Sequence, residues 1–104
     1  MLRLTMLVDG VREIRPLEDG AWFVGRGPMF PVRLDFPDVS ERHALLNVSR
    51  GVATIKDLRS ANGTYVNGEL LTDEVQLGGG DVVQIGKSLL RVSDDTEEES
   101  AAAP

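Results

Sequence analysis

The 104-residue sequence contains no cysteine and only one histidine. Without thiols the chain has no disulfide, no iron–sulfur cluster, no thiolate zinc site and no cysteine nucleophile. One histidine is too few for an all-histidine metal site or for a relay of histidines. The carboxylates are scattered and show none of the spacing of a metal-binding loop. The sequence therefore predicts no metal ion and no cofactor.

Long apolar runs are also missing. No stretch approaches the ~20 consecutive apolar residues that a membrane-spanning helix needs, and the first residues lead into no signal-peptide core. We therefore expect no direct membrane insertion and a cytoplasmic location, or a place on the cytosol-facing side of a larger protein. The hydrophobic content of 41% is that of an ordinary folded domain with one core.

The net charge of −6 is spread unevenly along the chain. Five acidic side chains and no basic one lie within residues 94–99, whereas residues 1–93 carry 12 acidic and 11 basic side chains. The sequence thus predicts a folded domain over residues 1–93 and an acidic disordered tail or linker over residues 94–104. A nearly neutral domain lacks the positive field of a nucleic-acid-binding protein, so nucleic acid is not a predicted partner.

Short apolar segments are separated by Gly, Asp, Asn and Pro throughout residues 1–93, and no window keeps a helical period. Asp9-Gly10 and Asn67-Gly68 are hairpin turn signals, and residues 49–51 separate two further apolar segments. This pattern predicts an all-β domain, either an antiparallel sandwich or a barrel.

Residues that form hydrogen bonds cluster in the predicted connections: Arg26, residues 40–43 and residues 60–64. Connections gather at the ends of a sandwich, where a rigid scaffold often carries function. On this pattern alone, an ordinary surface ion pair is the simpler account of Arg26. Ser40 and His43 lie three residues apart, but no hydrolase-type elbow surrounds the serine, so no enzyme is predicted.

Three segments in this order resemble the forkhead-associated (FHA) domain family: Gly25-Arg26, then VSERHA over residues 39–44, then DLRSANGTYVNG over residues 57–68. The resemblance covers roughly residues 3–93, and the ordered set is specific although each piece alone is weak. It implies a two-sheet antiparallel β-sandwich of about eleven strands, in keeping with the strand pattern. It also implies a non-catalytic module that binds phosphothreonine-containing protein segments downstream of a Ser/Thr kinase. The expected partner is such a protein or peptide, either the kinase or its substrate.

Carried over by position, the resemblance implies that Arg26 holds the phosphate, Ser40 donates its hydroxyl to the phosphate, and Asn62 bonds the main chain of the ligand. Four residues are expected to support the loops: Gly25, His43, Gly63 and Asn67. Five more are expected as possible contacts to residues that flank the phosphothreonine: Glu41, Arg42, Arg59, Ser60 and Ala61.

Two positions depart from the family pattern. Glu41 stands where a basic or polar donor is frequent, and Ala61 stands where a hydroxyl residue is frequent. Both changes leave open an alternative, a scaffold of the same fold that binds its partner or self-associates without phosphate.

Thr96 lies among acidic residues and resembles a substrate of acidophilic kinases. As a phosphosite it would bind this domain's own pocket or that of a second copy. A solvating linker is the alternative interpretation of the same acidic segment.

Overall fold

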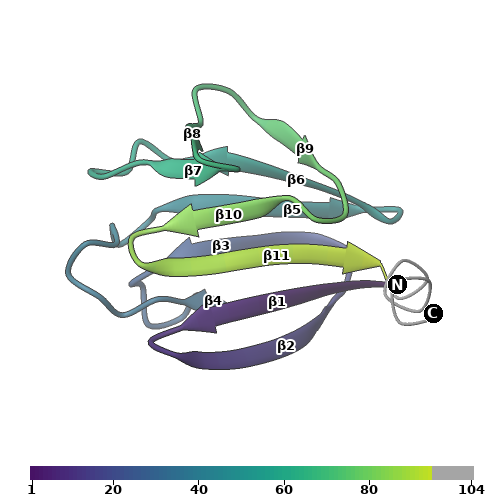
Figure 1. The fold of residues 1–104 in the computed structure, drawn as a ribbon, viewed down its shortest axis with the longest axis horizontal. Coiled ribbons are helices and arrows are strands. Elements are labelled where there is room, and N and C mark those ends of the chain that lie inside the picture. The colour runs from purple at the N-terminus through teal and green to yellow at the C-terminus, as the bar shows by residue number, and fades with distance from the viewer. Residues whose placement is uncertain (95–104) are drawn as a thin grey trace.

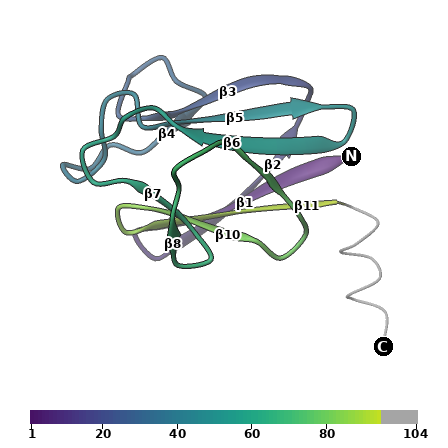
Figure 2. The same ribbon diagram turned by 90° about the horizontal axis from the view of Figure 1, so that it is seen from above.

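The structure is a computed structural model that describes residues 1–94. Eleven strands stack as two sheets, which Figures 1 and 2 show from two directions. One sheet has six strands in the order β2-β1-β11-β10-β7-β8, and the other has five in the order β4-β3-β5-β6-β9. The predicted two-sheet β-sandwich is confirmed. The strands are β1 (Leu2–Val8), β2 (Val11–Leu17), β3 (Gly20–Gly25), β4 (Val32–Arg33), β5 (Ala44–Ser49), β6 (Val52–Asp57), β7 (Thr64–Val66), β8 (Glu69–Leu70), β9 (Val75–Leu77), β10 (Val82–Ile85) and β11 (Ser88–Asp94).

Three tight hairpins have the backbone that their turn residues predict. Asp9-Gly10 joins β1 to β2, Arg50-Gly51 joins β5 to β6, and Asn67-Gly68 joins β7 to β8. Both central residues have positive φ in each turn, at 51° and 78°, 52° and 75°, and 52° and 84°. Two positive φ values match the right-handed twist of the flanking strands, and glycine adopts the second without steric cost.

The structure adds details that the strand pattern does not show. β4 runs parallel to β3, whereas every other strand pair among residues 1–94 is antiparallel. β8 has only two residues, which are too few to show an alternation of apolar and polar side chains. β11 continues to Asp94, the first residue of the predicted tail.

The core lies between the sheets and consists of alternate residues from their strands. In β1, for example, Leu2, Leu4 and Met6 are buried while Arg3 and Thr5 point to the opposite face. This packing fixes where each strand ends and therefore where the connections leave the sandwich. The connections over residues 26–31, 34–43 and 58–63 emerge together at the end of the sandwich opposite the N-terminus (Figures 1 and 2).

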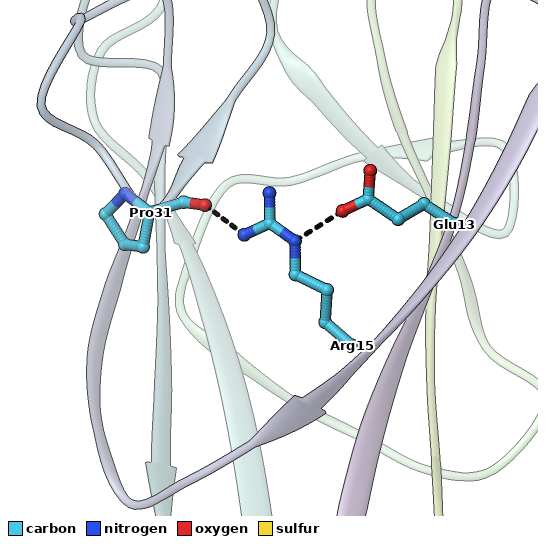
Figure 3. A network of polar contacts seen from close by, with 3 residues as sticks. All are labelled: Glu13, Arg15 and Pro31. Carbon is cyan, nitrogen blue, oxygen red and sulfur yellow. Dashed lines mark hydrogen bonds and ion pairs between the residues drawn. The ribbon is translucent and has the colours of Figure 1, made fainter.

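At one edge of the sandwich, the side chain of Arg15 in the edge strand β2 links the two sheets (Figure 3). Its Nε donates to the carboxylate of Glu13 at 2.5 Å, and its Nη1 donates to the carbonyl of Pro31, which precedes β4 in the other sheet. An exposed ion pair of this kind stabilises a fold by about 1 kcal/mol at most. The charges and Pro16 also hinder a further strand from pairing with this edge.

Residues 1–94 contain no helix of the length and apolar character that crossing a membrane requires.

Candidate functional site

Arg26 is the first residue after β3 and is exposed. Its backbone N–H donates to the Ser40 carbonyl at 3.1 Å, and its side-chain Nε donates to the Val39 carbonyl. The guanidinium is therefore held against the segment before β5. Among residues 1–94, no group accepts a hydrogen bond from its two terminal nitrogens, which leaves a planar pair of donors for an anion.

Gly25 explains how Arg26 comes so close to that segment. A Cβ atom at Gly25 would lie 2.3 Å from the Glu41 carbonyl oxygen and 2.9 Å from the Ser40 carbonyl oxygen. Backbone passes directly over backbone here, so any side chain would push the Ser40 segment away. The glycine thus sets the spacing between the arginine and the serine.

Ser40 is half-buried, and its hydroxyl oxygen accepts a hydrogen bond from the Ala61 N–H at 2.9 Å. A hydroxyl also has one proton to donate, and no acceptor for it lies among residues 1–94. Ser40 therefore joins two loops through its oxygen, and its O–H donates to no other group among residues 1–94.

His43 is fully buried and braces both loops from beneath. Its Nδ1 lies 3.0 Å from the backbone nitrogen of Ser40. A backbone N–H can only donate, so Nδ1 accepts this hydrogen bond. Nε2 then carries the ring proton and donates to the Gly63 carbonyl at 2.8 Å. These partners assign the neutral ring with the proton on Nε2.

Asn62 is exposed and follows Ala61 in the second loop. Its Nδ2 donates to the Asp38 carbonyl at 2.9 Å, which ties the loop to the segment before Ser40. The second amide proton and Oδ1 have no partner among residues 1–94, so the side chain offers one donor and one acceptor. That pair of groups is what the main chain of an extended peptide requires.

Residues 22–86, a span that includes Arg26, Ser40, His43 and Asn62, match the FHA domain family model over more than half of the chain. The chain belongs to the FHA domain family. The resemblance in the sequence motifs is thereby confirmed.

Two curated relatives of this FHA domain come from mycobacteria. FHA domain-containing protein FhaA of Mycobacterium tuberculosis is 39% identical over 82 residues, which make up 79% of this chain and 15% of FhaA. Glycogen accumulation regulator GarA of Mycolicibacterium smegmatis is 46% identical over 63 residues, 61% of this chain and 39% of GarA. The chain thus spans less than half the length of each of these relatives.

Solved structures agree with this assignment. The FhaA FHA domain, in its complex with the intracellular domain of Rv3910, has a TM-score of 0.81 and 35% identity, covering 89% of this chain and 100% of that one. A second FHA structure, from a study of phosphothreonine-dependent FHA domain interactions, has a TM-score of 0.74 and 35% identity, covering 88% and 96%.

Asp57 organises the second loop of this FHA domain, a role that the sequence analysis did not predict. Its carboxylate accepts bonds from the Ser60 hydroxyl at 2.6 Å, the Ser60 N–H at 3.1 Å and the Thr64 hydroxyl at 2.7 Å. The Ser60 oxygen in turn accepts from the Gly63 N–H at 2.9 Å. An Asp followed by Ser three residues later is the available signal, because this spacing lets the side chain cap a turn. The Ser60 hydroxyl is thus used within the loop.

Acid should weaken the fold partly through Asp57. Burial alone would raise its pKa, but the bonds from Ser60 and Thr64 outweigh burial and hold the pKa below the ordinary value. The folded pKa is below the unfolded one, so this stabilisation is complete above about pH 4 and is lost as the pH falls through the folded pKa. We expect the free energy of unfolding to decrease less steeply below about pH 4 in Asp57→Asn than in wild type. Urea unfolding across that pH range measures the difference. An acid limb identical to wild type would contradict this assignment.

The residues expected to flank a ligand lie around this site. Glu41, Arg42 and Arg59 are exposed, and Arg59 adopts φ 57°. Their contacts to a ligand remain predictions. The Arg33 side chain, also near the loops, donates to the Arg26 carbonyl at 3.2 Å and pairs with Asp35 at 3.5 Å. Thr96, the predicted phosphosite, lies outside the described residues.

Gly63 and Asn67 shape the chain on either side of β7. Gly63 has φ +88°, and a Cβ there would lie 2.6 Å from a methyl group of Leu70. The Asn67 amide accepts from the Val82 N–H and donates to the Asp81 carboxylate, both at 2.9 Å. Asn67 therefore fastens the β7–β8 hairpin to β10. It supports the scaffold of the site through β7.

A recess of about 490 Å³ lies beside Asn62. Its lining includes Asp38, Tyr65 and Gln84. Gly86 keeps it open on one side, because a Cβ there would lie 2.9 Å from the Asp38 carboxylate. The lining of the recess carries one acidic group, the Asp38 carboxylate.

Proposed function

We propose that this FHA domain binds phosphothreonine-containing protein segments made by a Ser/Thr kinase, and that it acts by binding alone. The observation that carries the proposal is the pairing of Arg26 and Ser40, whose backbones are hydrogen-bonded and whose side chains both retain donors. FHA domains are readers of phosphorylated motifs. Phosphothreonine dependence in a solved relative of similar fold supports the same role here. The partner would be the kinase or its substrate, and the place of action the cytoplasm.

The chemistry of phosphothreonine suits this arrangement. A phosphothreonine carries nearly two negative charges and three acceptor oxygens. The terminal nitrogens of Arg26 would take two of these bonds and the Ser40 hydroxyl a third. Each charge-assisted hydrogen bond contributes about 1.5–3 kcal/mol net. Asn62 would bond the ligand main chain and so hold the segment extended.

The recess beside Asn62 would receive a ligand side chain next to the bound main chain. The Asp38 carboxylate in its lining favours a basic or hydrogen-bond-donating side chain over an acidic one.

Ala61 limits the number of phosphate contacts because it contributes only its N–H, which is already bonded to Ser40. Ala61→Ser would place a hydroxyl at this rim position. We expect it to strengthen phosphopeptide binding by about tenfold, the value of one further charge-assisted bond. Isothermal titration with one phosphothreonine peptide measures the gain. Equal strengthening of the unphosphorylated peptide would argue against a phosphate contact.

The second candidate function, a phosphate-independent scaffold, is favoured by Glu41. Its exposed carboxylate follows directly after Ser40. A carboxylate a few ångströms from a phosphate costs about 1–4 kcal/mol near a surface. A partner without phosphate would avoid that repulsion.

One titration separates the two candidates. A degenerate phosphothreonine peptide library and its unphosphorylated twin are each titrated into the wild-type chain. The proposed function requires that only the phosphorylated library binds. Equal binding of both libraries would refute it and establish the scaffold.

A further inference from the structure

One row of directly paired residues crosses all six strands of the six-stranded sheet. From β8 to β2 the row consists of Leu70, Tyr65, Gln84, Leu89, Leu7 and Arg12. Met6, Ile85 and Leu90, which are neighbours of row residues along their strands, are buried in the core. Because successive side chains of a strand point to opposite faces, the row lies on the outer face of the sheet. It forms a continuous path from one edge of this face to the other.

The path begins at the recess beside Asn62. Tyr65 and Gln84 of the row line that recess, and the next residue of the row is Leu89, the partner of Gln84 on β11. Gln84 is exposed, and its Nε2 donates to the Gly86 carbonyl at 3.2 Å. Its second amide proton and its Oε1 have no partner among residues 1–94, so they are available to the main chain of a segment that leaves the recess.

An apolar groove lies on the far side of Gln84. It has a volume of about 280 Å³, and four of its lining residues are apolar: Leu7, Val82, Leu89 and Leu90. Leu7 is 44% exposed and Val82 36% exposed. Contiguous exposed apolar surface on a small domain marks an interaction site. The chemistry of the groove therefore fits an aliphatic or aromatic side chain.

The groove and the recognition loops lie at the same end of the sandwich. Leu7 is near the turn from β1 to β2, and Leu89 is near the turn from β10 to β11. Figure 1 shows both turns at the end where the connections over residues 26–31, 34–43 and 58–63 emerge. One partner can thus cover the loops, the recess and the groove without passing around an edge of the sheet.

The distance from the recess to the groove is short. Two strand spacings separate Tyr65 from Leu89, which is about 10 Å. An extended segment covers this distance with about three residues. A side chain that reaches the groove would therefore lie about five residues from a phosphothreonine held at Arg26, when the residues that cross the loops are included.

We propose that the phosphorylated partner continues from Asn62 across Gln84 and buries an aliphatic or aromatic side chain in the groove between Leu7, Val82 and Leu89. This contact rests on the proposed function, because the bound phosphothreonine brings the segment to the groove. Once the phosphate is held, the second contact is intramolecular and needs no further loss of translational freedom. The groove would thus select among phosphorylated segments that the phosphate site alone does not distinguish.

A leucine scan tests this contact. The probes are phosphothreonine peptides with degenerate flanks that contain no large apolar residue. One leucine is placed in turn at each position from about three to about seven residues before and after the phosphothreonine. We expect leucine at one position, or at two positions that are two residues apart, to strengthen binding about tenfold, because alternate side chains of an extended segment face the sheet. Isothermal titration measures the gain.

Two variants assign this gain to the groove. Leu7→Thr and Val82→Thr each replace an exposed apolar side chain, so the fold should be retained. In both, the gain from leucine should fall to about threefold or less, whereas the affinity for peptides without leucine should equal that of wild type. The matched control Val52→Thr makes the same change at a valine that is 42% exposed in β6 of the other sheet. Its gain should be that of wild type.

Four outcomes would overturn this contact. Phosphorylated peptides that bind without any gain from leucine would exclude it and leave the proposed function intact. Absence of binding by every phosphorylated peptide would contradict the proposed function as well. A full gain in both Leu7→Thr and Val82→Thr would place the leucine elsewhere. A wild-type chain that sediments as a dimer without peptide, together with a monomeric Val82→Thr variant, would assign the groove to a second copy.

Discussion

Arg26→Ala is expected to weaken phosphothreonine peptide binding by about a hundredfold or more, which corresponds to ~3 kcal/mol. The substitution removes both terminal nitrogens that have no acceptor among residues 1–94. It leaves the Arg26 N–H to Ser40 bond intact, because that bond belongs to the backbone. Isothermal titration measures the affinity, and urea unfolding checks that the fold is retained.

Two further variants make this result specific. Arg26→Lys keeps the charge but not the planar fork, so we expect a smaller loss. Arg50→Asn removes the same charge at the opposite end of the sandwich, and asparagine tolerates the φ of 52° found there. Its affinity should equal that of wild type. An Arg26→Ala variant that binds as wild type, or an Arg50→Asn variant that is equally weakened, would contradict the site.

His43→Ala is expected to destabilise the fold by about 3 kcal/mol and to loosen both recognition loops. The substitution leaves a cavity where a fully buried ring stood, and it leaves the Ser40 N–H and the Gly63 carbonyl without partners. Urea unfolding measures the stability, and hydrogen exchange of the Ser40 amide measures the loosening. Phosphopeptide affinity should fall as well, although the His43 ring is fully buried beneath the loops.

The matched control is Ser93→Ala. Ser93 is also buried, but its hydroxyl has no hydrogen-bond partner among residues 1–94. Its replacement removes a polar atom without breaking a bond, so the unfolding free energy should hardly change. An equal loss in both variants would mean that burial alone, and not the bridge between the loops, accounts for the effect at His43.

The sequence allowed much of the fold to be predicted because the relevant signals are local. Alternation places every second residue of β1 in the core, and turn chemistry marks Asp9-Gly10 and Asn67-Gly68. The parallel course of β4 and the two-residue strand β8 carried no such signal. Short elements are decided by the neighbours with which they pair.

The candidate site shows the same division between local sequence signals and contacts that depend on the folded chain. The ordered motifs predicted that Arg26, Ser40 and Asn62 act together. They did not show that the Ser40 oxygen accepts from Ala61, or that Asp57 holds the second loop. They also did not reveal the recess beside Asn62, because its lining comes from segments far apart in the sequence.

The sequence by itself determined the all-β class and the family, and it predicted the residues of the candidate site, since each depends on local order and spacing. Only the tertiary structure decided how these residues are joined. Gly25 and His43 bring Arg26, Ser40 and Gly63 together across loops separated by up to 37 residues in the chain. Such contacts depend on the packing of two sheets, which no single segment specifies.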